Sequence, residues 1–339
     1  MPLMRREVLC SRRETTYGTD PGVTLATDAK DVLSVSVTDE ATMYGRHVRS
    51  LYLQPSRVST IGQRLYRIST TEYLRGSNSV YSAAVFPQID AILTAAGMTS
   101  SYAAPAGVET HTYIPSYDAC GSAAFRVYRD GILYPLTGVR GDASIQFTPG
   151  APAVVSFNGT GRFGAATDTP LTNPAYTSEP SHPPIVMDCN FAPYADAPTI
   201  AQFGHVHNVA LNFRMGTEVV GSMSCDTTSL GVLRIQNTGA GSLDDPGIEV
   251  VFDAEQPVTG ALNPDTEWLD RFTAREISVA SSITVGDSDS NRFVVSFARL
   301  FCQSVAPITL KGMPGFHVVA RLLGSAAAAA EDSLTITCD

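Results

Sequence analysis

Apolar and polar residues alternate with a period of two along much of this chain, which is the pattern of β-strands with one buried face. The alternation is clearest within residues 122–163, where Ile145 and Phe147 lie between polar neighbours and Val155 and Phe157 repeat the pattern. Three turn-forming segments interrupt it: Arg129–Gly131, Gly138–Gly141 and Pro149–Gly150. We therefore predict four short antiparallel strands joined by three turns, with one face buried and the other facing solvent.

The second half of the chain shows the same alternation. Residues 209–215 and 248–253 each place an apolar side chain at every second position. Five further strands are predicted after them: Glu276–Val285, Phe293–Phe301, Ile308–Lys311, Phe316–Leu322 and Leu334–Cys338.

The N-terminal region is harder to interpret. We predict a strand within residues 1–19, then a polar and irregular segment, Asp20–Arg49, with a strand at Val32–Val37. The apolar residues of Leu51–Ile68 are unevenly spaced and indicate one or two strands. Residues 72–81 are predicted to form a loop.

Two segments have a helical period instead. In Phe86–Gly97, Pro87 suits the first helical position and Gly97 the C-terminal cap, and the apolar stripe consists of Ile89, Ile92, Leu93 and Ala96. The second helix is predicted over residues 264–276, with Asn263 as its cap and Trp268, Leu269 and Phe272 as its stripe.

Strands, one helix and a meander thus occur twice, which suggests an internal duplication. We predict a mainly β protein of two tandem domains, 1–177 and 178–339, each an antiparallel β-sandwich or open barrel with one short helix. The Pro-rich segment 164–184 is predicted to be an extended linker between them.

Composition narrows the class of function. The formal net charge is −10, whereas a protein that grips nucleic acid carries a basic surface that displaces phosphate counterions. Charged residues are 17% of the chain, below the roughly 25% of a typical soluble domain. A surface covered by neighbours in an assembly and a Ser/Thr-rich β protein both explain this value.

The cysteines and apolar runs add exclusions. The six cysteines are scattered without a C-x-x-C pair, so we expect reduced, buried residues and not a zinc module. They are Cys10, Cys120, Cys189, Cys225, Cys302 and Cys338. We also expect neither a signal peptide nor a membrane span, because the apolar runs are too short.

Catalytic and binding motifs are weak. Gly159, Gly161 and Gly164 fit G-x-G-x-x-G, but a Pro-rich segment and not a helix follows them. His205 and His207 would share one face of a strand, as two metal ligands or as two solvent-facing histidines. Paired carboxylates lie in turn-like segments and predict hairpin tips: Asp244–Asp245, Asp287 with Asp289, and Glu331–Asp332. We predict no catalytic, cofactor-binding or metal-binding residue.

Two short matches have simpler explanations. Arg140-Gly141-Asp142 spells an integrin-recognition tripeptide, but it coincides with the predicted second turn. Asn158-Gly159-Thr160 fits a glycosylation sequon, which has no meaning without secretion.

Several segments follow one another in a characteristic order along the chain. They are Arg6–Leu9, Glu14–Pro21, the helical segment Val85–Gly97, the meander from Asp130 to Phe157-Asn-Gly-Thr-Gly161, and the Ala-rich turn before Glu331–Thr337. In this order they resemble the opening, the single helix, the meander and the last strand of tail tube (major tail) proteins of long-tailed, non-contractile bacteriophages.

The resemblance implies a structural virion protein and not an enzyme. Its rings would stack head to tail into the tube through which DNA is ejected, without binding DNA specifically. Expected partners are other copies of the chain, a tape-measure protein in the lumen, and tail terminator and tip proteins. The expected locations are the virion tail and, during assembly, the host cytoplasm.

The resemblance also implies a ring symmetry. Family rings typically present six tube domains, so two domains per chain imply a ring of three chains with pseudo-sixfold symmetry. One tube domain with a large insertion would imply six chains instead.

Two other functions stay open at this point. The first is a β-sandwich adhesion, carbohydrate-binding or tail decoration module, which exposed aromatic clusters would favour. The second is a metal hydrolase that uses His205 and His207.

Overall fold

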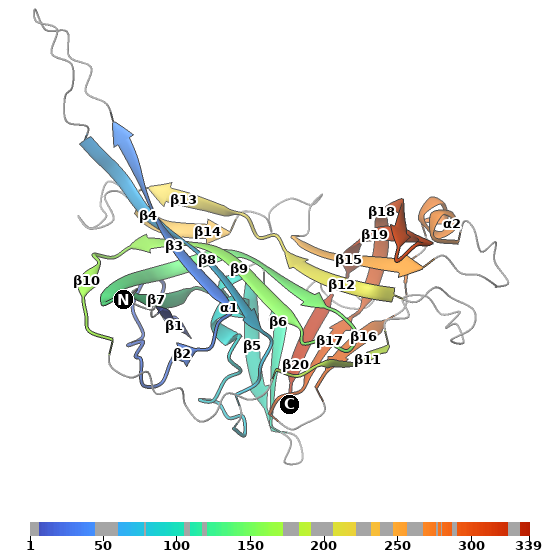
Figure 1. Ribbon diagram of the computed structural model, residues 1–339, viewed down its shortest axis with the longest axis horizontal. Helices are drawn as coiled ribbons and strands as arrows, with labels where there is room; N and C mark the ends of the chain where they lie inside the picture. The colour runs from blue at the N-terminus through green and yellow to red at the C-terminus, as the bar shows by residue number, and fades with distance from the viewer. Residues whose placement is uncertain are drawn as a thin grey trace, which may run out of the picture.

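The computed structural model describes residues 7–44, 60–77, 79–104, 109–116, 121–171, 183–190, 206–221, 232–237, 247–255, 267–275, 277–278, 280–286, 290–324 and 333–339. These residues form two antiparallel sheets, a separate hairpin and two short helices (Figure 1). The predicted mainly β fold is therefore confirmed.

The larger sheet has twelve strands. They are β1 (Glu7–Arg13), β2 (Ala29–Lys30), β3 (Ser34–Tyr44), β4 (Thr60–Tyr73), β7 (Ala123–Arg129), β8 (Ile132–Phe147), β9 (Val154–Phe163), β10 (Thr167–Asp168), β12 (Val206–Phe213), β15 (Ile248–Glu255), β18 (Arg299–Leu310) and β19 (Met313–Leu323).

The smaller sheet has six strands in the order β11-β16-β17-β20-β6-β5. They are β5 (Met98–Ala103), β6 (Thr110–Pro115), β11 (Val186–Asn190), β16 (Ser281–Val285), β17 (Phe293–Phe297) and β20 (Leu334–Cys338). The separate hairpin pairs β13 (Thr217–Gly221) with β14 (Val232–Asn237).

Within the larger sheet, eight strands pair in one antiparallel series, β3-β4-β9-β8-β12-β15-β19-β18, which we call the long path. A branch leaves it at β8, whose first half pairs with β7 and, through β7, with β1 and β2. The second half of β8 pairs with β12. Strand β8 thus connects the two halves of the chain.

Strand β8 corrects the predicted meander. Two strands and a turn were expected, but Ile132–Phe147 is one strand of 16 residues. The first glycine of the expected turn, Gly138, instead lies in an irregularity of the β8–β9 pairing, where the register shifts between Thr137 and Arg140. Gly138 has a φ of 62° there. At Gly141 a Cβ would lie 2.1 Å from the Asn158 carbonyl oxygen, so only glycine fits this close approach of β8 and β9.

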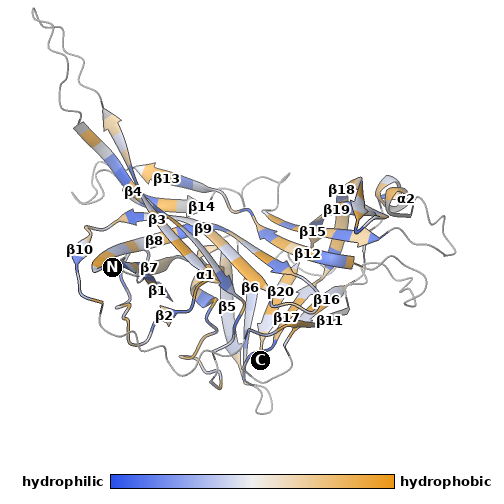
Figure 2. Cartoon of the chain, viewed as in Figure 1, coloured by the Kyte–Doolittle hydropathy of each residue, from blue (hydrophilic) through white to orange (hydrophobic). Residues whose placement is uncertain are grey.

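One continuous hydrophobic core joins both halves. Figure 2 shows apolar and polar residues alternating along the strands, and in β12, β15 and β19 the alternate apolar residues are the buried ones. Both sheets cross the expected boundary near residue 177, the larger at the β8–β12 pair and the smaller at the β6–β20 pair. The division into domains 1–177 and 178–339 stays a prediction.

The long path nevertheless contains a repeated strand order. We call β3, β4, β9 and β8 the first unit, and β12, β15, β19 and β18 the second unit. In each unit the order in space is first, second, fourth and third strand along the chain. In each unit a helix also follows the second strand in the sequence, α1 after β4 and α2 after β15.

Both helices are shorter than predicted. Helix α1 spans Asp90–Ala95, so Pro87 lies before it, and the Asp90 amide donates to the Pro87 carbonyl at 3.0 Å. All six of its residues are buried, whereas a stripe was expected, because α1 packs among β1, β5, β7 and β8. Gly97 follows with a φ of 84°, as expected of a cap.

Helix α2 spans Glu267–Ala274, and the expected cap Asn263 lies outside the described residues. The helix packs on β18, but Leu269 is 44% exposed and Phe272 is 36% exposed. These two members of the predicted apolar stripe are therefore largely uncovered by the described residues.

Two other segments are more regular than predicted. Within Asp20–Arg49 a strand was expected at Val32–Val37, and β3 continues that strand to Tyr44, while Ala29–Lys30 forms β2. The start of the segment expected to be a linker is packed on the protein, because β10 pairs with β8 and Leu171 packs against a small cluster with Val8 and Tyr128. Residues 172–182 lie outside the described part.

Candidate assembly surface

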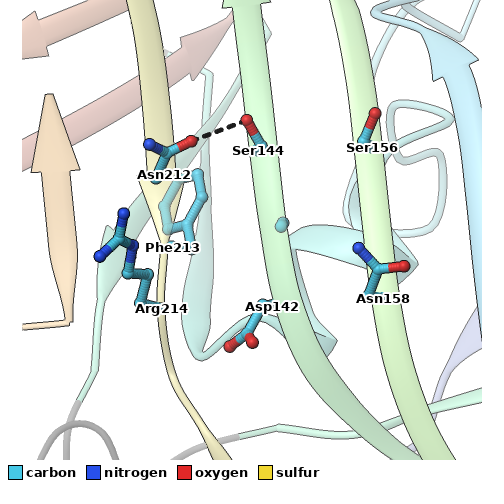
Figure 3. A pocket seen from close by; sticks show the side chains of 8 residues that line it. Asp142, Ser144, Ser156, Asn158, Asn212, Phe213 and Arg214 are labelled. Atoms are coloured by element: carbon cyan, nitrogen blue, oxygen red, sulfur yellow. Dashed lines mark hydrogen bonds between the residues drawn. The ribbon is translucent and has the colours of Figure 1, made fainter. Parts of the chain in front are cut away.

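The seam between the two units is a closed β-ladder. Ile145 of β8 lies opposite Leu211 of β12, and both side chains are fully buried. On the opposite face of the sheet the Ser144 hydroxyl donates to the Asn212 side-chain oxygen at 2.8 Å, as Figure 3 shows. The Gly216 amide donates to the Asp142 carboxylate at 3.0 Å. The seam therefore joins the units through backbone, core and side-chain contacts.

The face of the long path that points away from the core, which we call the open face, consists mainly of small polar side chains around the seam. A shallow depression of about 220 Å³ lies there, lined by Asp142, Ala143, Ser144, Ser156, Asn158, Asn212, Phe213 and Arg214 (Figure 3). The Phe213 side chain has no exposed surface, so the depression offers no aromatic platform for a sugar ring.

Three basic side chains on the open face of the second unit have carboxylate partners. Arg214 lies 2.8 Å from Glu249, His207 lies 2.5 Å from Glu255, and His317 lies 2.7 Å from Asp253. Each pair joins neighbouring strands. This part of the face therefore does not present a basic stripe to a passing polyanion.

The long path ends in two strand edges. Among the described residues, β3 pairs only with β4, and the outer edge of β18 carries only the bridge between Ile277 and Phe301 at its start. Val37 of β3 and Val305 of β18 are partly buried side chains at the two margins of the core. Edges of this kind are templates for pairing with another chain.

The β3–β4 hairpin projects from one end of the molecule, while β18, β19 and α2 lie toward the other end (Figure 1). Near the outer part of the hairpin, Met43 is 65% exposed and lies opposite Ile61, which is 46% exposed. Arg67 and Glu40 form an ion pair at 2.8 Å closer to its base. The outer part of the hairpin is therefore exposed, whereas Ile68 nearer its base is buried in the core.

The loop after β1 forms hydrogen bonds to residues of both halves of the chain. The Glu14 carboxylate accepts from the Gly138 amide at 2.7 Å, from the Gly18 amide at 2.7 Å and from the Ser122 hydroxyl at 2.6 Å. The Tyr17 hydroxyl in turn accepts from the Ile235 amide of β14. Glu14 and Tyr17 therefore hold the β13–β14 hairpin close to β8.

The first unit buries an acid that the second unit lacks. The side chain of Glu72 on β4 points inward and is 2% exposed, and burial raises its pKa from 4.5 to about 7. Lys30 and Arg75 act against that rise, and Arg75 itself pairs with Asp31 at 2.8 Å. The last inward residue of β15, Ala254, has the corresponding position in the second unit.

The expected chemical candidates do not form a catalytic or metal site in the described residues. His207 pairs with Glu255, and His205 lies outside those residues. Within the same ranges no group of three or more His, Cys, Asp or Glu residues could hold a metal ion. The paired carboxylates at 244–245, 287/289 and 331–332 also lie outside.

The short motifs are parts of strands. Gly159 and Gly161 lie inside β9, and the next described element is strand β10, so the helix that a nucleotide-binding motif requires does not follow, as predicted. Arg140–Asp142 lies within β8 with Gly141 buried, and Asn158 faces outward from β9. Cys10, Cys302 and Cys338 are buried free thiols, as predicted.

Sequence reasoning missed both free edges. Pro307 within β18 was the available signal, because proline occurs in sheets mainly on edge strands. Strand β3 gave no such signal, because Thr38, Asp39 and Glu40 place polar side chains on both of its faces.

Among the described residues no helix is long and apolar enough to cross a membrane. Comparisons of the chain with protein-family models and with curated proteins found no match.

Proposed function

We propose that this chain is the tail tube subunit of a long-tailed, non-contractile bacteriophage. The observation that carries the proposal is the long path, an eight-stranded antiparallel sheet with a pairing edge at each end. A head-to-tail contact that repeats through a rotation closes into a ring. Stacked rings of this chain would form the tube, occupied first by a tape-measure protein and then by DNA in transit.

The number of strands favours three chains per ring. With about 4.8 Å between strands and a tilt of about 40°, 24 strands close at a backbone diameter of roughly 50 Å. Six chains would supply 48 strands and about twice that diameter. After side chains are subtracted, the smaller ring has a bore of the order of one DNA duplex.

The open face would line this bore. Its small hydroxyl and amide groups and its paired charges give a polyanion few contacts to hold, which suits a conduit. The net charge of −10 acts in the same direction. We expect the lumen to be neutral or acidic.

Contacts between rings would come from the projecting β3–β4 hairpin. Met43 and Ile61 offer apolar surface for such a contact. Tail terminator and tip proteins would cap the tube in the virion tail, after assembly in the host cytoplasm.

The experiment is electron microscopy of the purified protein, reconstructed without imposed symmetry. We expect rings or tubes with three copies per ring and pseudo-sixfold symmetry. Six identical subunits per ring would contradict the trimer but not the tube. Monomers at all concentrations would contradict the tube and favour an adhesion or decoration module.

A further inference from the structure

The seam between the units provides a template for a contact between copies. In the seam, the third strand of the first unit, β8, pairs with the first strand of the second unit, β12. If a further unit followed the second unit in the same way, the third strand of the second unit would pair with the first strand of that further unit. These strands are β18 and β3, the two free edges of the long path.

The two units can be aligned residue by residue. Strand β4 ends at Tyr73, opposite Val154 of β9, and β15 ends at Glu255, opposite Gly315 of β19. With these strand ends matched, inward-facing residues correspond to inward-facing residues along all four strands.

The alignment makes Val37 of β3 the counterpart of Leu211, because each lies opposite the corresponding inward residue of the second strand, Ile68 or Val250. It also makes Pro307 the counterpart of Ile145, because these residues lie opposite Phe316 and Val155 of the fourth strands. In the seam Ile145 lies opposite Leu211.

We infer that β18 of one copy pairs antiparallel with β3 of a second copy of this chain. Three cross-strand pairs on the core side define the register: Val305 with Asp39, Pro307 with Val37, and Thr309 with Val35. This inference rests on the proposed ring and names the residues that close it.

The surroundings of the two edges agree with this joint. Val37 and Val305 are each only partly covered by the core of their own chain, whereas the aligned seam residues Leu211 and Ala143 are 0% and 4% exposed. Pairing would cover both valines as the seam covers its own residues. The bridge from Ile277 reaches only Phe301, and no described residue other than those of β19 pairs with β18 from Gln303 onward.

The joint can be tested on the open face, where substitution does not disturb the core. The register places Thr38 opposite Ala306, and both are exposed in the single chain. Directly opposite residues have Cα atoms about 4.5–5.5 Å apart, which a disulfide can bridge. A pair displaced by two residues is about 7–8 Å apart, which is too far.

The experiment compares the double variant Thr38→Cys/Ala306→Cys with the displaced pair Ser36→Cys/Ala306→Cys and with the unsubstituted chain. Each is oxidised, then examined by non-reducing denaturing electrophoresis and by electron microscopy. We expect the first variant to give species of two and three chains, with at least fivefold less linkage in the displaced pair and only background in the unsubstituted chain.

Other outcomes separate the joint from the tube. Stronger linkage in the displaced pair overturns the register, and rings without linkage in either variant overturn the joint but not the tube. Linkage without rings or tubes supports the joint and contradicts the proposed function. The absence of both rings and linkage contradicts both.

Discussion

The seam and the free edges are the same kind of strand boundary in two different states. At the seam, Leu211 and Ile145 are fully buried and polar side chains bond across the top. At the edges, the aligned positions hold a partly covered Val37 and an exposed Pro307. A strand pair that forms within one chain during folding can use large apolar side chains. A strand edge that is exposed to solvent until the chains assemble carries smaller, polar or proline residues instead.

The largest expected effect comes from truncating matched positions. Leu211→Ala should lower the free energy of unfolding of the single chain by about 2–5 kcal/mol, because it opens a cavity in a closed core. Val37→Ala should lower it by about 1 kcal/mol or less, because the side chain is already partly exposed. Urea denaturation of both variants measures the difference, and equal losses would show that the edge is as closed as the seam.

The second prediction uses the acid that distinguishes the units. The pKa of Glu72 is about 7 in the folded chain, against 4.5 as its ordinary value. The contribution of Glu72 to the free energy of unfolding is therefore complete below pH 4.5 and is lost as the pH rises through 7. Glu72→Gln should therefore stabilise the chain at pH 8 by up to about 3 kcal/mol, and the gain should vanish near pH 4.5.

Denaturation curves at several pH values provide the measurement. Glu249→Gln, at a paired group on the open face, is the matched control and should change the profile little. A Glu72→Gln profile parallel to that of the unsubstituted chain would mean that this carboxyl does not titrate there.

The sequence predicts strands well where one face is closed. The alternation at Val209, Leu211 and Phe213 and that at residues 248–253 both became strands with those faces buried. Strand β20, predicted as Leu334–Cys338, has the predicted bounds. In each case burial of one face keeps the period of two visible.

Prediction failed where a residue type that is typical of one structure is required for another reason. Gly138 and Gly141 have the composition of a turn, but here they allow an irregularity and a close strand approach inside β8. From Thr38 to Glu40 strand β3 is polar on both sides, and among the described residues it pairs only with β4. The seam could not be predicted, because pairing between distant strands leaves no local pattern.

The third prediction concerns assembly. Val305→Asp would place a second acid opposite Asp39 in the joint, and like charges directly opposite destabilise a sheet. The ring should dissociate at least tenfold more readily, which is about 1.4 kcal/mol. Because Val305 also packs against the core of its own chain, the free energy of unfolding of the single chain is measured beside the assembly.

Sedimentation or mass photometry across a concentration series gives the dissociation constant. Val305→Asn keeps the size without the charge, so it should weaken assembly less. Identical effects of the two substitutions would remove charge repulsion from the explanation.

The smallest effect is expected within the seam itself. Ser144→Ala removes the hydrogen bond to Asn212 and should cost about 0.5–1.5 kcal/mol. Ser156→Ala, on the same face of β9, is the control and should be close to neutral. If both substitutions are neutral in thermal denaturation, backbone and core alone hold the seam.

Strand β8 also has a mechanical consequence. It is 16 residues long, which at about 3.3 Å per residue is roughly 50 Å. It bonds to β7 at one end, to β12 at the other and to β9 along most of its length. A pull along this strand would load many hydrogen bonds at the same time in shear, instead of opening them one after another. The two halves of the chain should therefore resist separation under tension far better than two domains joined by a linker.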